Sequence, residues 1–164
     1  MRPRPDPVGP GQESVWQYPR PAIAELGKRH IRIEHFGVVV ADTYAAVRTI
    51  ETSHPPTWYI PPDAITPGLL RGSQRRSFCE WKGEAQYWHL EIGGQIVRDV
   101  AWSYSDPTPT FAILRNHVAF YASALDVCTV DGERVRPQPG GFYGGWITSD
   151  LAGPFKGVPG SMGW

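Results

Sequence analysis

Short apolar runs broken by glycine, proline and polar residues make up most of the chain, and several alternate apolar with polar positions. In "HIRIEHFGVVVADT" (residues 30–43), Ile31 and Ile33 alternate with polar side chains, Gly37 permits a turn, and a run of valines follows. A period of two places apolar side chains on one face of a strand, and β-branched residues favour extended backbone. This stretch therefore predicts a β-hairpin.

Other segments show the same pattern. The segment "YWHLEIGGQIVRDVAWSY" (residues 87–104) predicts a second hairpin, with Gly93–Gly94 as its two-residue turn. An Asp-Gly pair at residues 131–132 is another strong hairpin signal. Further strands are predicted in "TWYIPPDAI" (57–65), "HVAFYAS" (117–123) and "VCTVDGERV" (127–135).

Two segments change period and predict short helices. In "DTYAAVRTIET" (residues 42–52), Tyr44, Val47 and Ile50 recur every third residue behind a polar N-cap. This helix has to end before "SHPP", because a residue that precedes proline disfavours helical geometry. The segment "TPGLLR" (residues 66–71) begins with a Thr-Pro pair suited to an N-cap and a first helical position. The pattern as a whole predicts a mainly β fold with one or two short helices.

Composition supports a loop-rich β fold of one domain. Glycine and proline amount to 18 and 17 of the 164 residues and lie between the apolar runs. A chain of this length with 41% hydrophobic residues can bury a core without staples. We divide it into a flexible N-terminal arm (residues 1–12), a β domain (residues 13–136) and a C-terminal extension (residues 137–164). The extension is rich in glycine and aromatic residues, and we expect it to pack on the domain as a coil.

Charge argues against two classes of partner. The 16 basic and 16 acidic residues balance, so no overall field attracts phosphate backbones or anionic lipid. We therefore expect neither nucleic acid nor a membrane as a partner. The densest basic cluster, in "RGSQRRS" (residues 71–77), is predicted to be a solvated loop.

Sequence motifs that the chain lacks predict its localisation and its metal content. The start "MRPRPDPVGPGQ" lacks the apolar core of a signal peptide, and the aliphatic run "GVVVA" is too short to span a bilayer, which predicts a cytoplasmic protein. Cys79 and Cys128 form no CxxC pair, so neither a zinc site nor a disulfide framework is expected. The chain also lacks the common phosphate-binding and catalytic motifs, and we expect no cofactor.

The segment "CEWKGEAQYW" (residues 79–88) concentrates reactive, charged and aromatic side chains. Buried charges need partners and exposed tryptophans favour association, so this density points to a site. Cys79 is a candidate nucleophile if a neighbouring base or cation stabilises its thiolate, and the alternative is an inert buried thiol. Lys82 and Glu84 flank Gly83 and could form an acid–base couple in one cleft, or an ordinary exposed ion pair.

Tryptophan and tyrosine cluster in the same parts of the chain. Their rings could form the walls of a pocket for a planar or cationic ligand, through stacking and cation–π attraction. The alternative is an aromatic core. Because these side chains carry polar groups that a plain core does not need, we favour the pocket. The residues concerned are Trp58, Tyr59, Trp81, Tyr87, Trp88, Trp102 and Tyr104.

Several of these blocks occur together in one known family. The chain contains "ESVWQYPRP", "ETSHPPTWYIPP", "CEWKGEAQYW", "VAWSYSDPTP" and "VAFY", in this order. In these blocks and their spacing it resembles the bacterial and fungal family known as domain of unknown function DUF427, over about residues 13–136. The C-terminal extension is similar to one found in some members.

The resemblance implies a β-tent-like fold, in which two antiparallel sheets meet at an angle over a ligand-sized cleft. Proteins with a similar architecture include zinc-binding modules that hold small ligands in an aromatic cage, and methionine sulfoxide reductases. This chain lacks the paired CxxC motifs of such zinc modules. The family brings no established activity with it.

We therefore expect a protein that binds a small polar or planar ligand in an aromatic-lined cleft. One alternative is an enzyme of unknown reaction that uses Cys79 or the Lys82/Glu84 pair. A second is a homo-oligomeric structural module, such as a homodimer joined through exposed aromatic residues. The candidate ligand-binding residues are Trp16, Tyr18, Arg20, His54, Tyr59, Trp81, Lys82, Glu84, Trp88, Trp102 and Tyr104.

Overall fold

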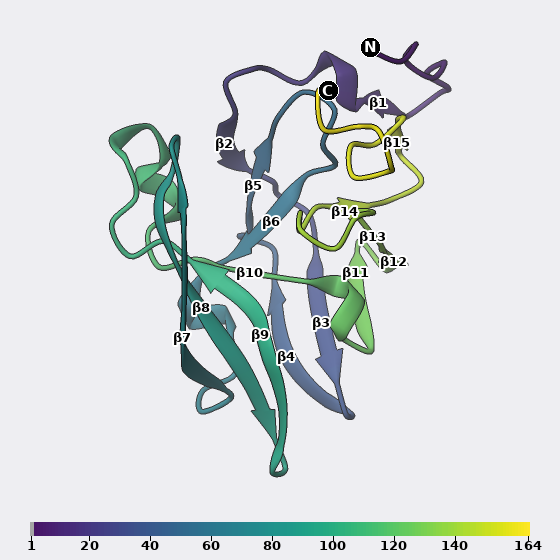
Figure 1. The fold of residues 1–164 in the computed structure, drawn as a ribbon. Coiled ribbons are helices and arrows are strands. Elements are labelled where there is room, and N and C mark those ends of the chain that lie inside the picture. The colour runs from purple at the N-terminus through teal and green to yellow at the C-terminus, as the bar shows by residue number, and fades with distance from the viewer. Residues whose placement is uncertain (1) are drawn as a thin grey trace.

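Two antiparallel sheets form the body of the protein (Figure 1). The structure is a computed structural model that describes residues 2–164. The larger sheet has seven strands in the described residues, in the order β2 (Ile23–Leu26), β5 (Val47–Ile50), β6 (Thr57–Ile60), β10 (Val118–Phe120), β9 (Gln95–Ser103), β8 (Gly83–Ile92) and β7 (Leu70–Cys79). The smaller sheet has the order β12 (Glu133–Arg134), β11 (Val127–Val130), β3 (Ile31–His35) and β4 (Val38–Thr43). The prediction of a mainly β fold is confirmed.

Short elements complete the described chain. Strand β1 (Glu13–Ser14) pairs in parallel with β15 (Leu151–Ala152), and β13 (Arg136–Pro137) pairs with β14 (Trp146–Ile147). The helical segments in residues 2–164 are short 3-10 turns: η1 (Val15–Gln17), η2 (Pro62–Ala64), η3 (Pro109–Leu114) and η4 (Ala122–Ala124). No helix in this part of the chain is long and apolar enough to cross a membrane.

The predicted hairpins are present. Strands β3 and β4 turn at Phe36–Gly37, β8 and β9 at Gly93–Gly94, and β11 and β12 at Asp131–Gly132. Both residues of each turn have positive φ. This backbone twist matches the right-handed twist of the flanking strands, which is why Asp-Gly and Gly-Gly pairs are reliable hairpin signals.

Both predicted helices are wrong. Residues 47–50 form strand β5, which pairs with β2 on one side and β6 on the other, so the three-residue recurrence of Tyr44, Val47 and Ile50 was a coincidence. Tyr44 lies outside the strand and is exposed. In "TPGLLR", Gly68 has a φ of 84° and strand β7 begins at Leu70. The solvated loop predicted at residues 71–77 is also part of β7, although its arginines are exposed.

The two sheets pack face to face around one hydrophobic core. Ile31 and Ile33 of β3 meet Ile60 of β6 and Leu90 of β8 there, all fully buried. Trp146 of β14 joins this core and donates a hydrogen bond from Nε1 to the Phe120 carbonyl, at 3.0 Å. A residue of the C-terminal segment is therefore part of the main core.

The two ends of the chain lie side by side (Figure 1). The Asp6 amide donates to the Gly153 carbonyl at 2.8 Å, and the Gln12 side chain donates to the Ser149 carbonyl at 3.0 Å. Between β13 and β14 the C-terminal segment runs past the outer face of the larger sheet, and this face carries the candidate site.

Candidate functional site

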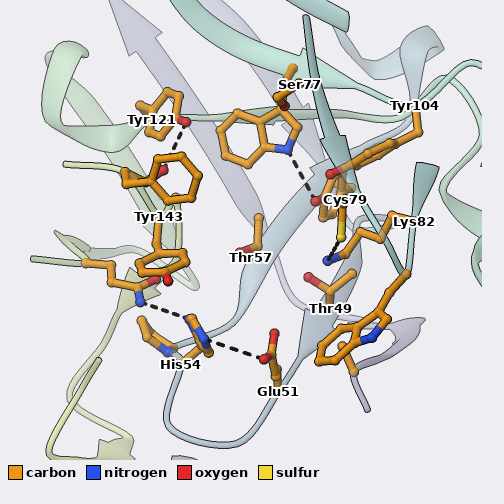
Figure 2. Close-up of a pocket in the computed structure, with 18 of the residues that line it drawn as sticks. Thr49, Glu51, His54, Thr57, Ser77, Cys79, Lys82, Tyr104, Tyr121 and Tyr143 are labelled. Carbon is orange, nitrogen blue, oxygen red and sulfur yellow. Dashed lines mark hydrogen bonds and ion pairs between the residues drawn. The ribbon is translucent and has the colours of Figure 1, made fainter. Parts of the chain in front are cut away.

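A cavity of about 360 Å³ opens on the face of the larger sheet that points away from the two-sheet core (Figure 2). Side chains at alternate positions of neighbouring strands face this cavity, because successive residues of a strand point to opposite faces. They are Thr49 of β5, Thr57 and Tyr59 of β6, Ser77 and Cys79 of β7, Tyr87 of β8 and Trp102 of β9.

Strand alternation separates neighbouring aromatic residues. Trp58 packs into the core between the sheets, whereas the next residue, Tyr59, lines the cavity. Tyr87 likewise lines the cavity, whereas Trp88 packs against the core and donates from Nε1 to Ser103 Oγ at 2.9 Å. The aromatic cluster is therefore divided: some of its rings line the cavity and others pack in the core between the sheets.

One wall of the cavity consists of packed aromatic rings. Trp102 lies 4.6 Å from Tyr121 between ring centroids and meets Tyr59 edge-on at 6.3 Å. Its Nε1 donates to the Tyr59 hydroxyl at 3.3 Å. Burial raises the pKa of Tyr59 and of Tyr104, so both phenols stay protonated at neutral pH and can donate hydrogen bonds.

The C-terminal segment forms a second wall, which meets the first at Trp102 and Tyr121. Gly144 lies against the Trp102 ring, and a Cβ there would be only 2.1 Å from the nearest ring carbon. The Tyr121 hydroxyl donates to the Phe142 carbonyl at 3.1 Å, and Tyr143 meets His54 edge-on with 4.8 Å between ring centroids. Gly144 of "GGFYGGW" thus allows close approach to the aromatic wall.

Polar groups gather on the floor of the cavity, between the two walls. His54 Nε2 lies 3.7 Å from Glu51 Oε2, and His54 Nδ1 lies 3.1 Å from Gln138 Nε2 (Figure 2). Burial, together with nearby lysine and arginine charges, lowers the pKa of His54 from 6.5 to about 4, so this imidazole is neutral at neutral pH. Burial raises the pKa of Glu51, although the same cations oppose the shift.

Cys79 and Lys82 meet at the turn between β7 and β8. Lys82 Nζ lies 3.9 Å from Cys79 Sγ and 5.5 Å from the centre of the Phe111 ring. Among residues 2–164, no carboxylate oxygen lies within 4.0 Å of this ammonium. Cys128, by contrast, is buried in the core, and burial raises the pKa of its thiol to about 12. Both cysteines are free.

The structure brings seven of the predicted site residues to this cavity and places the others elsewhere. Glu84 is exposed outside the cavity, so Lys82 and Glu84 do not share a cleft. Trp88 borders a separate hollow of about 470 Å³ on the other face of the sheet. The seven that line the cavity are His54, Tyr59, Cys79, Trp81, Lys82, Trp102 and Tyr104.

Three further candidates lie near the N-terminal segment. Trp16 packs on Trp164, with 5.7 Å between ring centroids, and the Tyr18 hydroxyl donates to Glu13 at 2.5 Å. Arg20 lies behind the floor, where Nη2 is 3.8 Å from Glu51 Oε2 and donates to the Thr52 carbonyl at 3.0 Å. Arg20 therefore acts on the cavity through its charge.

Several lining residues were not identified from the sequence. Glu51 and Thr57 flank His54 in a block that had been singled out, and alternation with Tyr59 would have indicated Thr57. The C-terminal contributors gave a weaker signal, the glycines that flank aromatic residues in "GGFYGGW". The residues missed include Thr49, Glu51, Thr57, Ser77, Phe78, Glu80, Tyr121, Gln138, Phe142, Tyr143 and Lys156.

The fold and the cavity define a mainly β protein with an aromatic-lined cavity on the outer face of its larger sheet. The sequence model of the domain of unknown function DUF427 matches residues 23–131, and the chain belongs to this family. No curated protein matches the chain. The matched region contains the aromatic wall together with Glu51, His54 and Lys82, whereas Gln138, Phe142, Tyr143 and Lys156 follow it. Within the described residues, no three His, Cys, Asp or Glu side chains come together as metal ligands.

Proposed function

We propose that the cavity binds a small planar ligand between its two walls. Its volume of about 360 Å³ falls in the range of roughly 300–1,000 Å³ that is usual for small-molecule sites. The observation that supports the proposal most strongly is the combination of aromatic walls with a few polar groups on one floor. Aromatic rings bind flat ligands by stacking, and a small polar set fixes their orientation.

Both walls of the cavity also carry aromatic side chains near its mouth. Trp81 is half-buried at the turn before β8, and Tyr143 is half-buried in the C-terminal segment. Phe78 and Phe142 line the mouth and are exposed. Exposed phenylalanines at a cavity mouth lose water-accessible apolar area when a ligand enters, which favours binding.

A second candidate function is covalent chemistry at Cys79. The observation that favours it is the ammonium of Lys82 at 3.9 Å from the sulfur, because a nearby cation stabilises a thiolate. Cys79 is half-buried and lines the cavity, so a bound ligand would be within its reach. The pairing of Lys82 with Glu84 as acid and base has no such support, since Glu84 lies outside the cavity.

A thermal-shift screen against a library of planar and non-planar metabolites tests the ligand proposal. A ligand that binds only the folded state adds about 2.7 kcal/mol of stability at a hundredfold excess over its dissociation constant. The matched pair of variants is Trp81→Ala, in the cavity, and Trp88→Ala, on the opposite face of the sheet. Both tryptophans are half-buried, so the two truncations are comparable.

We expect planar hits whose affinity, measured by calorimetry, falls in Trp81→Ala and is retained in Trp88→Ala. A screen without any planar hit would contradict the proposal. So would a hit that Trp88→Ala weakens and Trp81→Ala does not, because it would place the ligand in the hollow on the other face.

A further inference from the structure

The orientation of the Gln138 side chain is fixed by two backbone groups. Its Oε1 accepts a hydrogen bond from the Gly145 amide at 3.1 Å, and its Nε2 donates to the Lys156 carbonyl at 2.8 Å. A backbone N–H can only donate and a carbonyl oxygen can only accept. The amide group therefore cannot be flipped without breaking both bonds, and Gln138 is 96% buried, with 4% of its surface exposed.

This orientation determines the tautomer of His54. The second hydrogen on Gln138 Nε2 points to His54 Nδ1 at 3.1 Å, so Nδ1 has to accept. A neutral imidazole that accepts at Nδ1 carries its hydrogen on Nε2. His54 lines the cavity, so it presents an N–H donor there.

Glu51 places an acceptor beside that donor. Its Oε2 lies 3.7 Å from His54 Nε2 and 3.8 Å from Arg20 Nη2, and both separations are too long for hydrogen bonds. Among residues 2–164 the Glu51 carboxylate accepts no side-chain hydrogen bond, although its side chain is only 24% exposed. Glu51 lines the cavity, so a ligand N–H that enters it can supply the carboxylate with the hydrogen bond that no side chain provides.

We propose that the floor of the cavity recognises the lactam edge of a planar heterocycle, with His54 Nε2–H donating to the ring carbonyl and the Glu51 carboxylate accepting from the adjacent ring N–H. This inference rests on the proposed function, because it names the chemical class of the planar ligand. The aromatic walls contact the faces of the ligand ring, and the donor–acceptor pair on the floor forms hydrogen bonds with one edge of that ring.

Other charged groups around the floor fit this assignment. Lys156 Nζ and Arg20 Nη2 each lie 3.3 Å from the main-chain oxygen of Trp164, so these cations have a partner. Glu80 lies at the mouth and is exposed. Lys82 is a further donor toward the ligand, and it is also the anchor that an anionic ligand would use, so a carboxylate is the rival ligand class.

Two measurements test the inference. The first is a two-bond nitrogen–proton correlation spectrum of the histidine rings at pH 7, with His54→Gln used to assign the His54 signals. We expect the Nε2–H form in the wild type, and a mixture of tautomers in Gln138→Leu, which removes the constraint on Nδ1. A wild-type His54 in the Nδ1–H form would overturn the inference, whatever the protein binds.

The second measurement compares ligands by calorimetry. The lactam probes are 2-quinolone, uracil and hypoxanthine, with N-methyl-2-quinolone as the matched control and quinoline-2-carboxylate as the anionic rival. We expect at least one lactam to bind, N-methylation of 2-quinolone to weaken binding about tenfold or more, and Glu51→Gln to weaken lactam binding by about tenfold.

The outcomes separate the two proposals. If planar ligands bind but the lactams do not, or if N-methyl-2-quinolone binds as tightly as 2-quinolone, the lactam assignment is wrong and planar-ligand binding stands. Tighter binding of quinoline-2-carboxylate than of any lactam also overturns the lactam assignment, in favour of an anion on Lys82. If no planar compound from the library or the probe set binds, both proposals fail.

Discussion

Acidification should destabilise the protein through His54. Burial lowers the pKa of this imidazole from 6.5 in an unfolded chain to about 4 in the folded protein. Between these values the unfolded chain binds a proton that the folded protein does not, so the free energy of unfolding falls as the pH falls from 6.5 to 4. A window of about 2.5 pH units, at about 1.36 kcal/mol per unit, gives a loss of about 3 kcal/mol. The side chain is only 13% exposed, so solvent screens this effect little.

Urea unfolding between pH 4 and pH 7 measures this loss when the wild type is compared with His54→Gln. Glutamine at this position can still accept from Gln138 but does not titrate. Glu51 acts in the opposite direction, because its raised pKa adds stability at low pH that is lost as the pH rises. Both proteins keep Glu51, so the difference between the two stability curves isolates His54. Parallel curves for the two proteins over this range would refute the reasoning.

Two further predictions concern the C-terminal wall and the cysteines. Gly144→Ala should shift the C-terminal wall away from Trp102, because the new Cβ would lie 2.1 Å from the ring. This variant should have a lower melting temperature and should bind any ligand of the cavity more weakly. Gly163→Ala, which meets nothing within 4 Å, is the control, and equal effects of the two variants would contradict the steric argument. Iodoacetamide at pH 7.5 should alkylate Cys79 in the folded protein and leave Cys128 unmodified, because Cys128 is buried and has a pKa of about 12. Peptide mass spectrometry distinguishes the two sites, and labelling of Cys128 before Cys79 would contradict the burial of Cys128 in the core.

The sequence is sufficient to predict the hairpins of the sheets, but not to predict on which face of a sheet each aromatic side chain lies. Hairpins could be predicted because Gly-Gly and Asp-Gly pairs carry a local backbone preference. Trp58 and Tyr59 look equivalent in the sequence, and only their register in the sheet shows which of them faces the cavity. Register depends on pairing between distant strands, which no local pattern encodes. The same limit explains why Trp88 was grouped with the cavity residues and lies on the other face.

The error at β5 has a physical cause of the same kind. Val47, Arg48, Thr49 and Ile50 have three β-branched members, which favours a strand, but a three-residue apolar spacing also fits one turn of helix. Pairing with β2 and β6 decides between these options, because it satisfies the backbone groups of β5 on both edges. Long-range hydrogen bonding thus outweighs a weak local preference.

The polar floor shows why membership of the family does not by itself define the ligand. His54 and Glu51 lie within residues 23–131, the region that matches DUF427, whereas Gln138 lies beyond it. Gln138 determines which nitrogen of His54 carries the hydrogen, and its own orientation depends on Gly145 and Lys156, which also follow the matched region. A replacement of Gln138 by a side chain without a donor would free the imidazole to reverse its tautomer, and the floor would then present an acceptor where it now presents a donor. Under the lactam proposal, the C-terminal segment therefore contributes to ligand recognition as well as forming a wall of the cavity.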